Sequence, residues 1–353
     1  MTDAFTPGLL YRLPQKPRKV ALLRASRIGD FICTTPALRA LRVALPGAEI
    51  TMITLPLLRD LVARSPHLDR FIAFPGFPGI AEQFFDAYQA VQFLQKMQSE
   101  QFDLALQMQG SGVYSNPFTL LLGARVTVGF VRQGDSPGRL DAALPFPQKG
   151  HETQRILALT TFIGVPPQGE QMEFPLWSED HAMAENLLKD TKRPLIGLHT
   201  SARDVTRRWP LDHFAAVGKE LLHLYGGTAV ILGELDDRPA GDIVAREVGE
   251  HCLNLAGKTS LAQLGAVITR LSVLVTNDTG PAHIAYTLGT PTVTIFGGGS
   301  PERNGPPKSK LHQVLAFEVP CRPCDYAACP IEYRCLAGVT VQQVVDAASA
   351  VMR

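Results

Sequence analysis

Short apolar runs alternate with longer segments of helical periodicity, and this alternation constrains the fold more than any other feature of the sequence. An apolar run at residues 19–24 precedes a helical stretch at residues 31–44, and a second apolar run follows at residues 49–54. Apolar residues spaced three and four apart favour the helix, whereas short apolar runs favour strands. A strand, a helix and a strand in this order predict parallel strands with a right-handed crossover.

The same alternation recurs along the whole chain. Further strands are expected at residues 71–74, 102–106, 194–199, 228–232, 272–276 and 292–296. A Pro-rich, aperiodic segment at residues 165–177 separates the two series and is typical of a linker. We therefore predict an α/β protein with two doubly wound domains, residues 1–177 and 178–353. Ligands are expected at the carboxyl ends of the strands, in a cleft between the domains.

Composition excludes several classes of protein. The 353 residues are 45% hydrophobic and 19% charged, with a formal net charge of +1. A charge so close to zero gives no bulk attraction to nucleic acid, so no nucleic-acid partner is expected. The N-terminal segment carries Pro and charge where a signal peptide needs an apolar stretch. No run approaches the roughly 18 apolar residues of a membrane-spanning helix. We therefore expect a cytoplasmic protein.

A turn at residues 277–283, which reads NDTGPAH, is the first candidate for a ligand site. It follows the expected strand at residues 272–276 and precedes a segment of helical character. Gly280 permits a tight turn, and Pro281 suits the first position of a helix. The free N–H groups of that helix start favour an anion such as a diphosphate.

Three side chains of this turn are candidate donor-site groups. Thr279 offers a hydroxyl, and His283 lies within the first helical turn, where it could reach a phosphate or a sugar hydroxyl. Asp278 completes the set. The alternative interpretation is that Asp278 or Thr279 simply caps the helix, as such residues commonly do.

The loop after the strand at residues 194–199 adds hydroxyls and cations at a second strand end. Thr200 and Ser201 supply the hydroxyls, and Arg207 or Arg208 could neutralise a leaving diphosphate. The alternative is a solvated basic loop in which Trp209 and the following proline serve only packing.

Three further residues are candidates for the nucleoside part of a donor. Asp236 follows the strand at residues 228–232 and could accept hydrogen bonds from ribose hydroxyls. Lys258 and Thr259 precede a helix and could border the base pocket. The alternatives are a turn with solvated acids and a plain helix cap at Thr259 or Ser260.

The loop after the first strand holds the candidate catalytic residue. Asp30 could take the proton of an acceptor hydroxyl as its oxygen attacks an anomeric carbon, or it could cap the following helix. Ser26, Arg27 and Gly29 are expected to contact the acceptor, with Gly29 leaving room for close approach. No Asp-x-Asp motif occurs in the chain. Fixed cations and a helix N-terminus could stabilise the diphosphate instead of a metal.

Several motifs in order resemble glycosyltransferase family 9, the ADP-heptose:lipopolysaccharide heptosyltransferases. The resemblance spans nearly the whole chain after about residue 19. The matching segments are Ser26-x-x-Gly29-Asp30, residues 34–40 (TTPALRA), residues 207–210 (RRWP), residues 277–283 (NDTGPAH) and residues 296–306.

The resemblance implies a GT-B fold, with the acceptor on the first domain and the nucleotide sugar on the second. It implies transfer with inversion, no cofactor required for catalysis, ADP-heptose as donor and a lipid-linked saccharide as acceptor. Peripheral contact with the cytosolic face of the inner membrane would follow. It places the catalytic aspartate on Asp30 and donor contacts on Asp278, Thr279, Gly280 and His283. At the position of Arg207 the family often has lysine, and arginine keeps the charge but changes the geometry.

A cysteine cluster near the C-terminus is a candidate structural metal site. Four thiolates could hold zinc or iron, although only the first spacing fits the usual pair of short Cys-x-x-Cys elements. Reduced thiols or disulfides in a structured loop are the alternatives. The four residues are Cys321, Cys324, Cys329 and Cys335.

Other functions remain open from the sequence. The acceptor could be a protein, or the chain could bind sugar or nucleotide without catalysis. The turn at residues 110–115 is a near match to a dinucleotide-binding turn, which would indicate an oxidoreductase. A set of arginines could contact acceptor phosphates or lipid headgroups, with solvated surface charge as the alternative; these are Arg24, Arg27, Arg39, Arg59 and Arg125.

Overall fold

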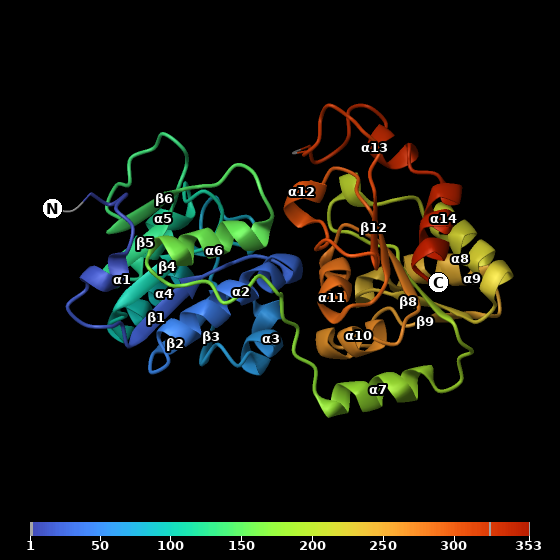
Figure 1. Cartoon of the computed structure of the whole chain (residues 1–353), viewed down its shortest axis with the longest axis horizontal. Coiled ribbons are helices and arrows are strands. Elements are labelled where there is room, and N and C mark those ends of the chain that lie inside the picture. Colours follow the sequence, from blue (N-terminus) through green and yellow to red (C-terminus); the bar gives the residue numbers. More distant parts are fainter. Residues whose placement is uncertain (1–2, 325, 353) are drawn as a thin grey trace. The chain divides into compact units, whose positions relative to one another are not determined.

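The computed structural model describes residues 3–324 and 326–352 (Figure 1). The chain divides into two compact units, Met1–Glu173 and Phe174–Arg353. Each unit contains one six-stranded sheet, and every strand pair in both sheets is parallel. The predicted α/β class with two doubly wound sheets is confirmed.

The sheet of the first unit has the order β3-β2-β1-β4-β5-β6. The strand order reverses between β1 and β4, and in such sheets ligands bind at this switch point, at the carboxyl ends of the strands. The strands are β1 (Lys19–Leu23), β2 (Glu49–Thr54), β3 (Arg70–Ala73), β4 (Leu104–Gln107), β5 (Val126–Val131) and β6 (Ala142–Pro145).

Helices cover both faces of this first sheet (Figure 1). One face packs against α4 and α5 around Phe118, whose ring meets those of Phe74 and Phe93. Elsewhere in the unit, α2 packs along α6. The helices are α1 (Leu9–Arg12), α2 (Ile28–Ala44), α3 (Arg59–Arg64), α4 (Ala87–Glu100), α5 (Ser115–Leu121) and α6 (Glu152–Phe162), with a 3-10 turn η1 (Pro56–Leu58).

The sheet of the second unit has the order β12-β11-β10-β7-β8-β9, so its switch point lies between β10 and β7. Both strands are fully buried and lead into loops that carry candidate site residues. The strands are β7 (Leu195–His199), β8 (Thr228–Leu232), β9 (Cys252–Asn254), β10 (Val273–Asn277), β11 (Thr292–Ile295) and β12 (His312–Leu315).

The core of the second unit is built around Trp209, which is 1% exposed. Its ring meets that of Phe214, and its Nε1–H donates to the backbone oxygen of Val339 over 3.0 Å. The helices are α7 (Ser178–Leu188), α8 (Leu211–Tyr225), α9 (Arg238–Val248), α10 (Leu261–Ile268), α11 (Gly280–Leu288), α12 (Pro301–Asn304), α13 (Arg334–Ala337) and α14 (Val341–Val351), with 3-10 turns η2 (Val205–Arg207) and η3 (Leu235–Asp237).

Candidate active site

The first candidate site lies where β1 leads into α2. The helix begins at Ile28 with Arg27 at the N-cap position, so Asp30 lies in the first turn rather than before the helix. The interpretation of Asp30 as the helix cap is therefore wrong. A carboxylate in the first turn is stabilised by the helix dipole. The Asp30 side chain is 36% exposed, so a ligand can reach it.

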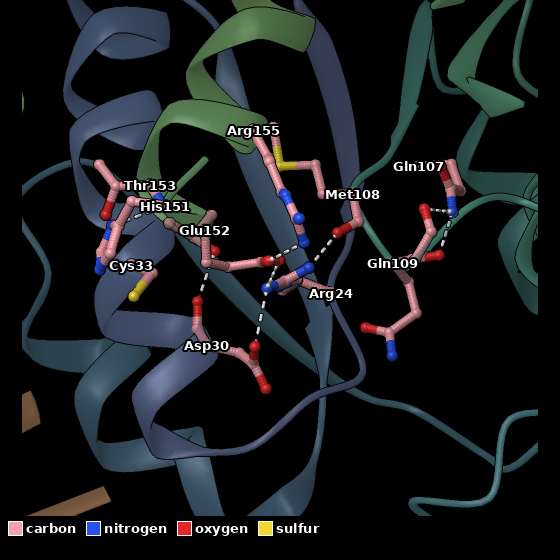
Figure 2. A network of polar contacts seen from close by, with 12 residues as sticks. Arg24, Asp30, Cys33, Gln107, Met108, Gln109, His151, Glu152, Thr153 and Arg155 are labelled. Carbon is pink, nitrogen blue, oxygen red and sulfur yellow. Dashed lines mark hydrogen bonds and ion pairs between the residues drawn. The ribbon is translucent and has the colours of Figure 1, made fainter. Parts of the chain in front are cut away.

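A buried guanidinium lies beside Asp30 (Figure 2). Arg24 follows β1 and is 2% exposed. Its Nη2 lies 3.2 Å from Oδ1 of Asp30 and 2.7 Å from Oε1 of Glu152, and its Nη1 donates to the backbone oxygen of Met108. The expectation that Arg24 contacts acceptor phosphates is wrong, because its guanidinium is enclosed by these partners.

The charges around Arg24 compensate for its burial. Burial disfavours the guanidinium, but the carboxylates of Glu152 and Asp30 outweigh that effect and raise the Arg24 pKa above its ordinary value. The thiol of the neighbouring Cys33 responds in the same direction. Burial, followed by the charges of Asp30 and Glu152, raises the pKa of its thiol, which therefore stays protonated.

The three residues expected to contact an acceptor lie around this turn. Gly29 is buried within α2, and Arg27 is exposed, with its Nε 3.0 Å from Oε2 of Glu82. Ser26 is 4% exposed, and its Oγ has no hydrogen-bond partner among the described residues.

The second candidate site lies in the second unit, where β10 leads into α11. Thr279 is the N-cap residue, and Gly280 and Pro281 open the helix. The Thr279 side chain makes no capping hydrogen bond. Asp278 precedes the cap, so the interpretation of Asp278 as the cap is wrong. Pro281 has no N–H and the Ala282 N–H donates to the Thr279 oxygen over 3.1 Å, but the start of α11 still presents the positive end of the helix dipole to an anion.

Arg207 reaches this turn from the other side of the switch point. Its Nη1 lies 3.2 Å from Oδ2 of Asp278, which is only 2% exposed. Its Nε lies 3.7 Å from Asp204. The structure thus brings together two residues that the sequence separates by 71 positions.

A buried histidine, which sequence analysis did not select, joins the hydroxyl groups of this site. Nδ1 of His199 lies 3.2 Å from Oγ1 of Thr276 and 3.3 Å from Oγ1 of Thr279, and Nε2 lies 3.3 Å from Oγ of Ser201. Burial lowers the His199 pKa to about 4, so the ring is neutral at pH 7. A neutral ring has one donor and one acceptor nitrogen and can therefore orient hydroxyls on both sides.

Asn277 ties the two loops of this site together. Its Oδ1 accepts from the Trp209 N–H over 3.0 Å, and its Nδ2 donates to the backbone oxygens of Thr200 and Ser201 over 3.1 and 3.3 Å. The loop after β7 is thereby held against the loop after β10.

Residues 90–333 match the model of glycosyltransferase family 9 (heptosyltransferase). The chain belongs to glycosyltransferase family 9. A curated relative, the lipooligosaccharide heptosyltransferase 2 of Haemophilus influenzae, is 27% identical over 316 residues, which are 85% of this chain and 89% of the relative.

Two solved structures share the fold of this chain. A family 9 glycosyltransferase from Veillonella parvula superposes with a TM-score of 0.79 over 95% of this chain and 97% of that one, at 22% identity. The ADP-heptose lps heptosyltransferase II of E. coli gives a TM-score of 0.75, 22% identity and coverage of 95% and 98%. The expected GT-B fold is confirmed. Membership of family 9 makes the chain a glycosyltransferase and overturns the oxidoreductase alternative.

The other donor candidates of this family 9 enzyme occupy different settings. Arg208 donates to the backbone oxygens of Ala202 and Arg203 and so holds its own loop. His283 is 5% exposed in the first turn of α11, with its ring 5.7 Å from that of Tyr286.

The three nucleoside candidates lie in and beside short turns. Asp236 is exposed within η3, and Lys258 is exposed. Thr259 is partly buried and does not cap α10, because Ser260 does so in a capping box with Gln263.

The cysteine cluster does not form the expected metal site. Within residues 3–324 and 326–352, no group of three or more His, Cys, Asp or Glu side chains is placed to hold a metal, and the cysteines are free thiols. Cys335 belongs to the apolar core, and the Cys329 sulfur accepts from the Tyr333 N–H over 3.1 Å. Among the described residues, these four thiols therefore form no disulfide and no group placed to hold a metal.

The loop of these cysteines contacts the segment that follows β11. Arg322 donates from Nε to the Gly297 oxygen over 2.9 Å and from Nη2 to the Phe296 oxygen over 3.0 Å. The N–H of Cys324 donates to the Gly298 oxygen over 2.8 Å. The loop thus supports the glycine segment that follows β11. In the part of the chain that the structure describes, no helix is both long and apolar enough to cross a membrane.

Proposed function

We propose that this enzyme transfers a heptose from ADP-heptose to a saccharide of the lipopolysaccharide core, with Asp30 as general base. The observation that carries the proposal is the position of Asp30. Its carboxylate is partly exposed in the first turn of α2, at the switch point of the first sheet. The relatives named above act on lipopolysaccharide or lipooligosaccharide, and one is named for ADP-heptose.

In this proposal the second unit binds the donor. The N–H groups at the start of α11 and the hydroxyl of Thr279 would bind the diphosphate. Arg207 would add a fixed positive charge, so the leaving ADP would need no metal ion. Ser201 would help through the hydrogen bond with His199. Asp236, Lys258 and Thr259 would border the nucleoside.

The first unit would bind the acceptor. The acceptor oxygen attacks the anomeric carbon, the bond from that carbon to the diphosphate oxygen breaks, and Asp30 accepts the hydroxyl proton. A single displacement of this kind inverts the anomeric configuration. Ser26, Arg27 and Gly29 would line the acceptor side. The acceptor would be reached at the cytosolic face of the inner membrane, through peripheral contact only.

A binding screen followed by a transfer assay tests this proposal. Thermal unfolding is measured with ADP-heptose, UDP-glucose and GDP-mannose, because a ligand that binds the folded state raises the unfolding temperature. Stabilisation by ADP-heptose alone is expected. Transfer to heptose-deficient lipopolysaccharide should then give a product of inverted anomeric configuration by NMR. Binding of only UDP- or GDP-sugars, or transfer only to a protein, would contradict the proposal.

A further inference from the structure

The buried charges next to Asp30 form a cluster that the proposed chemistry leaves unexplained (Figure 2). Glu152 is 1% exposed, Arg24 is 2% exposed and Arg155 is 7% exposed. With Asp30 the cluster holds two carboxylates and two guanidinium groups, so its formal charge is zero. Charged groups at this level of burial are rare unless paired, and their interactions are strengthened by the low dielectric.

One nitrogen atom joins the two carboxylates. Nη2 of Arg24 contacts Glu152 over 2.7 Å and Asp30 over 3.2 Å. The shorter contact goes to the buried Glu152, and the longer one goes to the partly exposed Asp30. Glu152 thus takes the larger share of the guanidinium charge, while Asp30 keeps one oriented contact.

The rest of the structure fixes Arg24 in place. Its backbone N–H donates to the Ile53 oxygen over 3.1 Å, and its backbone oxygen accepts from Oγ1 of Thr54 over 2.6 Å, so both bonds come from β2. Nη1 is held by the Met108 oxygen beyond β4. The guanidinium therefore has little freedom to follow a moving carboxylate, and it acts as a rigid support for Asp30.

Glu152 is fixed in the same way from α6. Nη1 of Arg155 lies 3.6 Å from its Oε2, and Nη2 of Arg155 donates to the Gln148 oxygen over 2.7 Å. The Arg155 guanidinium also lies 5.4 Å above the Phe146 ring. Glu152 thus lies between the guanidinium groups of Arg24 and Arg155, each of which also donates to a backbone oxygen.

We infer that Glu152 and Arg24 are positioning residues for Asp30, an inference that rests on the proposed role of Asp30 as base. Arg24 orients the carboxylate towards the acceptor. Glu152 takes up most of the Arg24 charge, so that this orientation does not make Asp30 too weak a base. A nearby unshared cation would favour the ionised carboxylate strongly and reduce its affinity for the acceptor proton.

Removing the Glu152 charge tests this inference directly. In Glu152→Gln, Arg24 loses its ion pair with Glu152 and keeps its ion pair with Asp30. We expect the acid limb of the kcat/KM profile to move to lower pH by roughly one unit, and kcat on its plateau to fall on the order of tenfold, because a weaker base accepts the proton less readily. The KM for ADP-heptose should change less than about twofold, since the donor residues lie in the other unit.

The other charged groups around the cluster stay the same in this variant. They are Cys33 on α2, His151 and Arg155 at the start of α6, and the Arg27–Glu82 pair at the surface. A change in the pH profile would therefore come from the loss of the Glu152 charge beside Arg24 and Asp30.

Two variants separate positioning from a structural role. Glu152→Asp keeps the charge, so the acid limb of its kcat/KM profile should lie close to the wild-type position. This should hold even where both variants lower the unfolding temperature. Glu100→Gln is the matched control, because Glu100 pairs with Arg70 in the same unit, and its loss should leave the pH profile unchanged. An unmoved profile in Glu152→Gln, or an equal shift in Glu100→Gln, would overturn the inference.

Arg24→Lys gives a second route if Glu152→Gln does not fold. Lysine keeps the charge but lacks the planar fork that contacts both carboxylates, so a lower kcat with an unchanged KM for ADP-heptose is expected. Wild-type kcat in this variant would overturn the inference. Asp30→Asn separates the two proposals. If Asp30→Asn is inactive while Glu152→Gln and Arg24→Lys behave as wild type, only this inference fails. If Asp30→Asn is fully active, the proposed function itself fails.

Discussion

At the scale of single residues, the buried His199 imposes a pH dependence on stability. Its pKa is about 4 in the folded chain because burial disfavours the charged ring, against roughly 6.5 when unfolded. The unfolded chain therefore binds more protons between these values, and stability falls as the pH falls through this window. The hydroxyls of Thr276, Thr279 and Ser201 depend on the neutral ring.

We predict that the lowered pKa of His199 reduces the free energy of unfolding by about 2 kcal/mol as the pH falls from 7 to 5. Urea unfolding at both pH values measures the difference. In His199→Gln this part of the pH dependence should disappear, whereas in the exposed control His251→Gln it should persist. An equal pH dependence in wild type and His199→Gln would contradict the assignment.

Arg207 gives a second prediction at this scale. Arg207→Ala removes the cation beside Asp278 and leaves that carboxylate buried without it. A charge-assisted contact of this kind contributes about 1.5–3 kcal/mol, so KM for ADP-heptose should rise at least roughly tenfold. Arg207→Lys should recover part of the loss, because it keeps the charge but not the fork. Steady-state kinetics on ADP-heptose measures both. An unchanged KM in Arg207→Ala would remove Arg207 from the donor site.

At the scale of elements, the long apolar patterns predicted the structure well and the short ones did not. The central strands β1, β2, β7, β8, β10 and β11 were expected, since their apolar runs are clear in the sequence. The strands β5, β6, β9 and β12 were not expected. β6, β9 and β12 are four residues or fewer and lie at or near sheet edges, where burial imposes little pattern.

Local sequence likewise predicted only some of the candidate site residues. The turn at residues 277–283 was expected because it follows a strand directly, and Asp30 was expected because it lies in the segment that follows the first strand. Glu152 and His199 were missed, because what makes them site residues is a partner 128 and 77 or more positions away. No local spacing carries that information. The cysteine cluster shows the converse, because a metal-like spacing does not by itself give a group of side chains placed to hold a metal among the described residues.

The glycine segment after β11 supports Asp278 by leaving space for it. A Cβ at Gly299 would lie 2.0 Å from Oδ2 of Asp278, so Gly299→Ala must displace a buried carboxylate. Such overpacking costs about 1–3 kcal/mol, and KM for ADP-heptose should rise together with a lower unfolding temperature. Gly47→Ala is the control, because a Cβ there meets nothing within 4 Å. Equal behaviour of the two variants would contradict this role of Gly299.

At the scale of the whole molecule, the two units have separate cores and separate sites. Hydrogen exchange with and without ADP tests the proposal that the second unit binds the donor and the first unit binds the acceptor. We predict that ADP slows exchange in residues 200–208 and in the first turn of α11, because these N–H groups bind the diphosphate. Residues 24–30 should be unaffected. Protection confined to residues 24–30 would contradict this prediction, because it would place the nucleotide in the first unit.

The central claim is that Asp30 is the base of an inverting heptosyl transfer. Its most direct test is the turnover of Asp30→Asn with ADP-heptose and heptose-deficient lipopolysaccharide. We predict that kcat falls by roughly 10²–10⁴-fold, the contribution of a positioned base, while the dissociation constant of ADP-heptose is unchanged. Turnover at the wild-type rate, with the same product configuration, would contradict it.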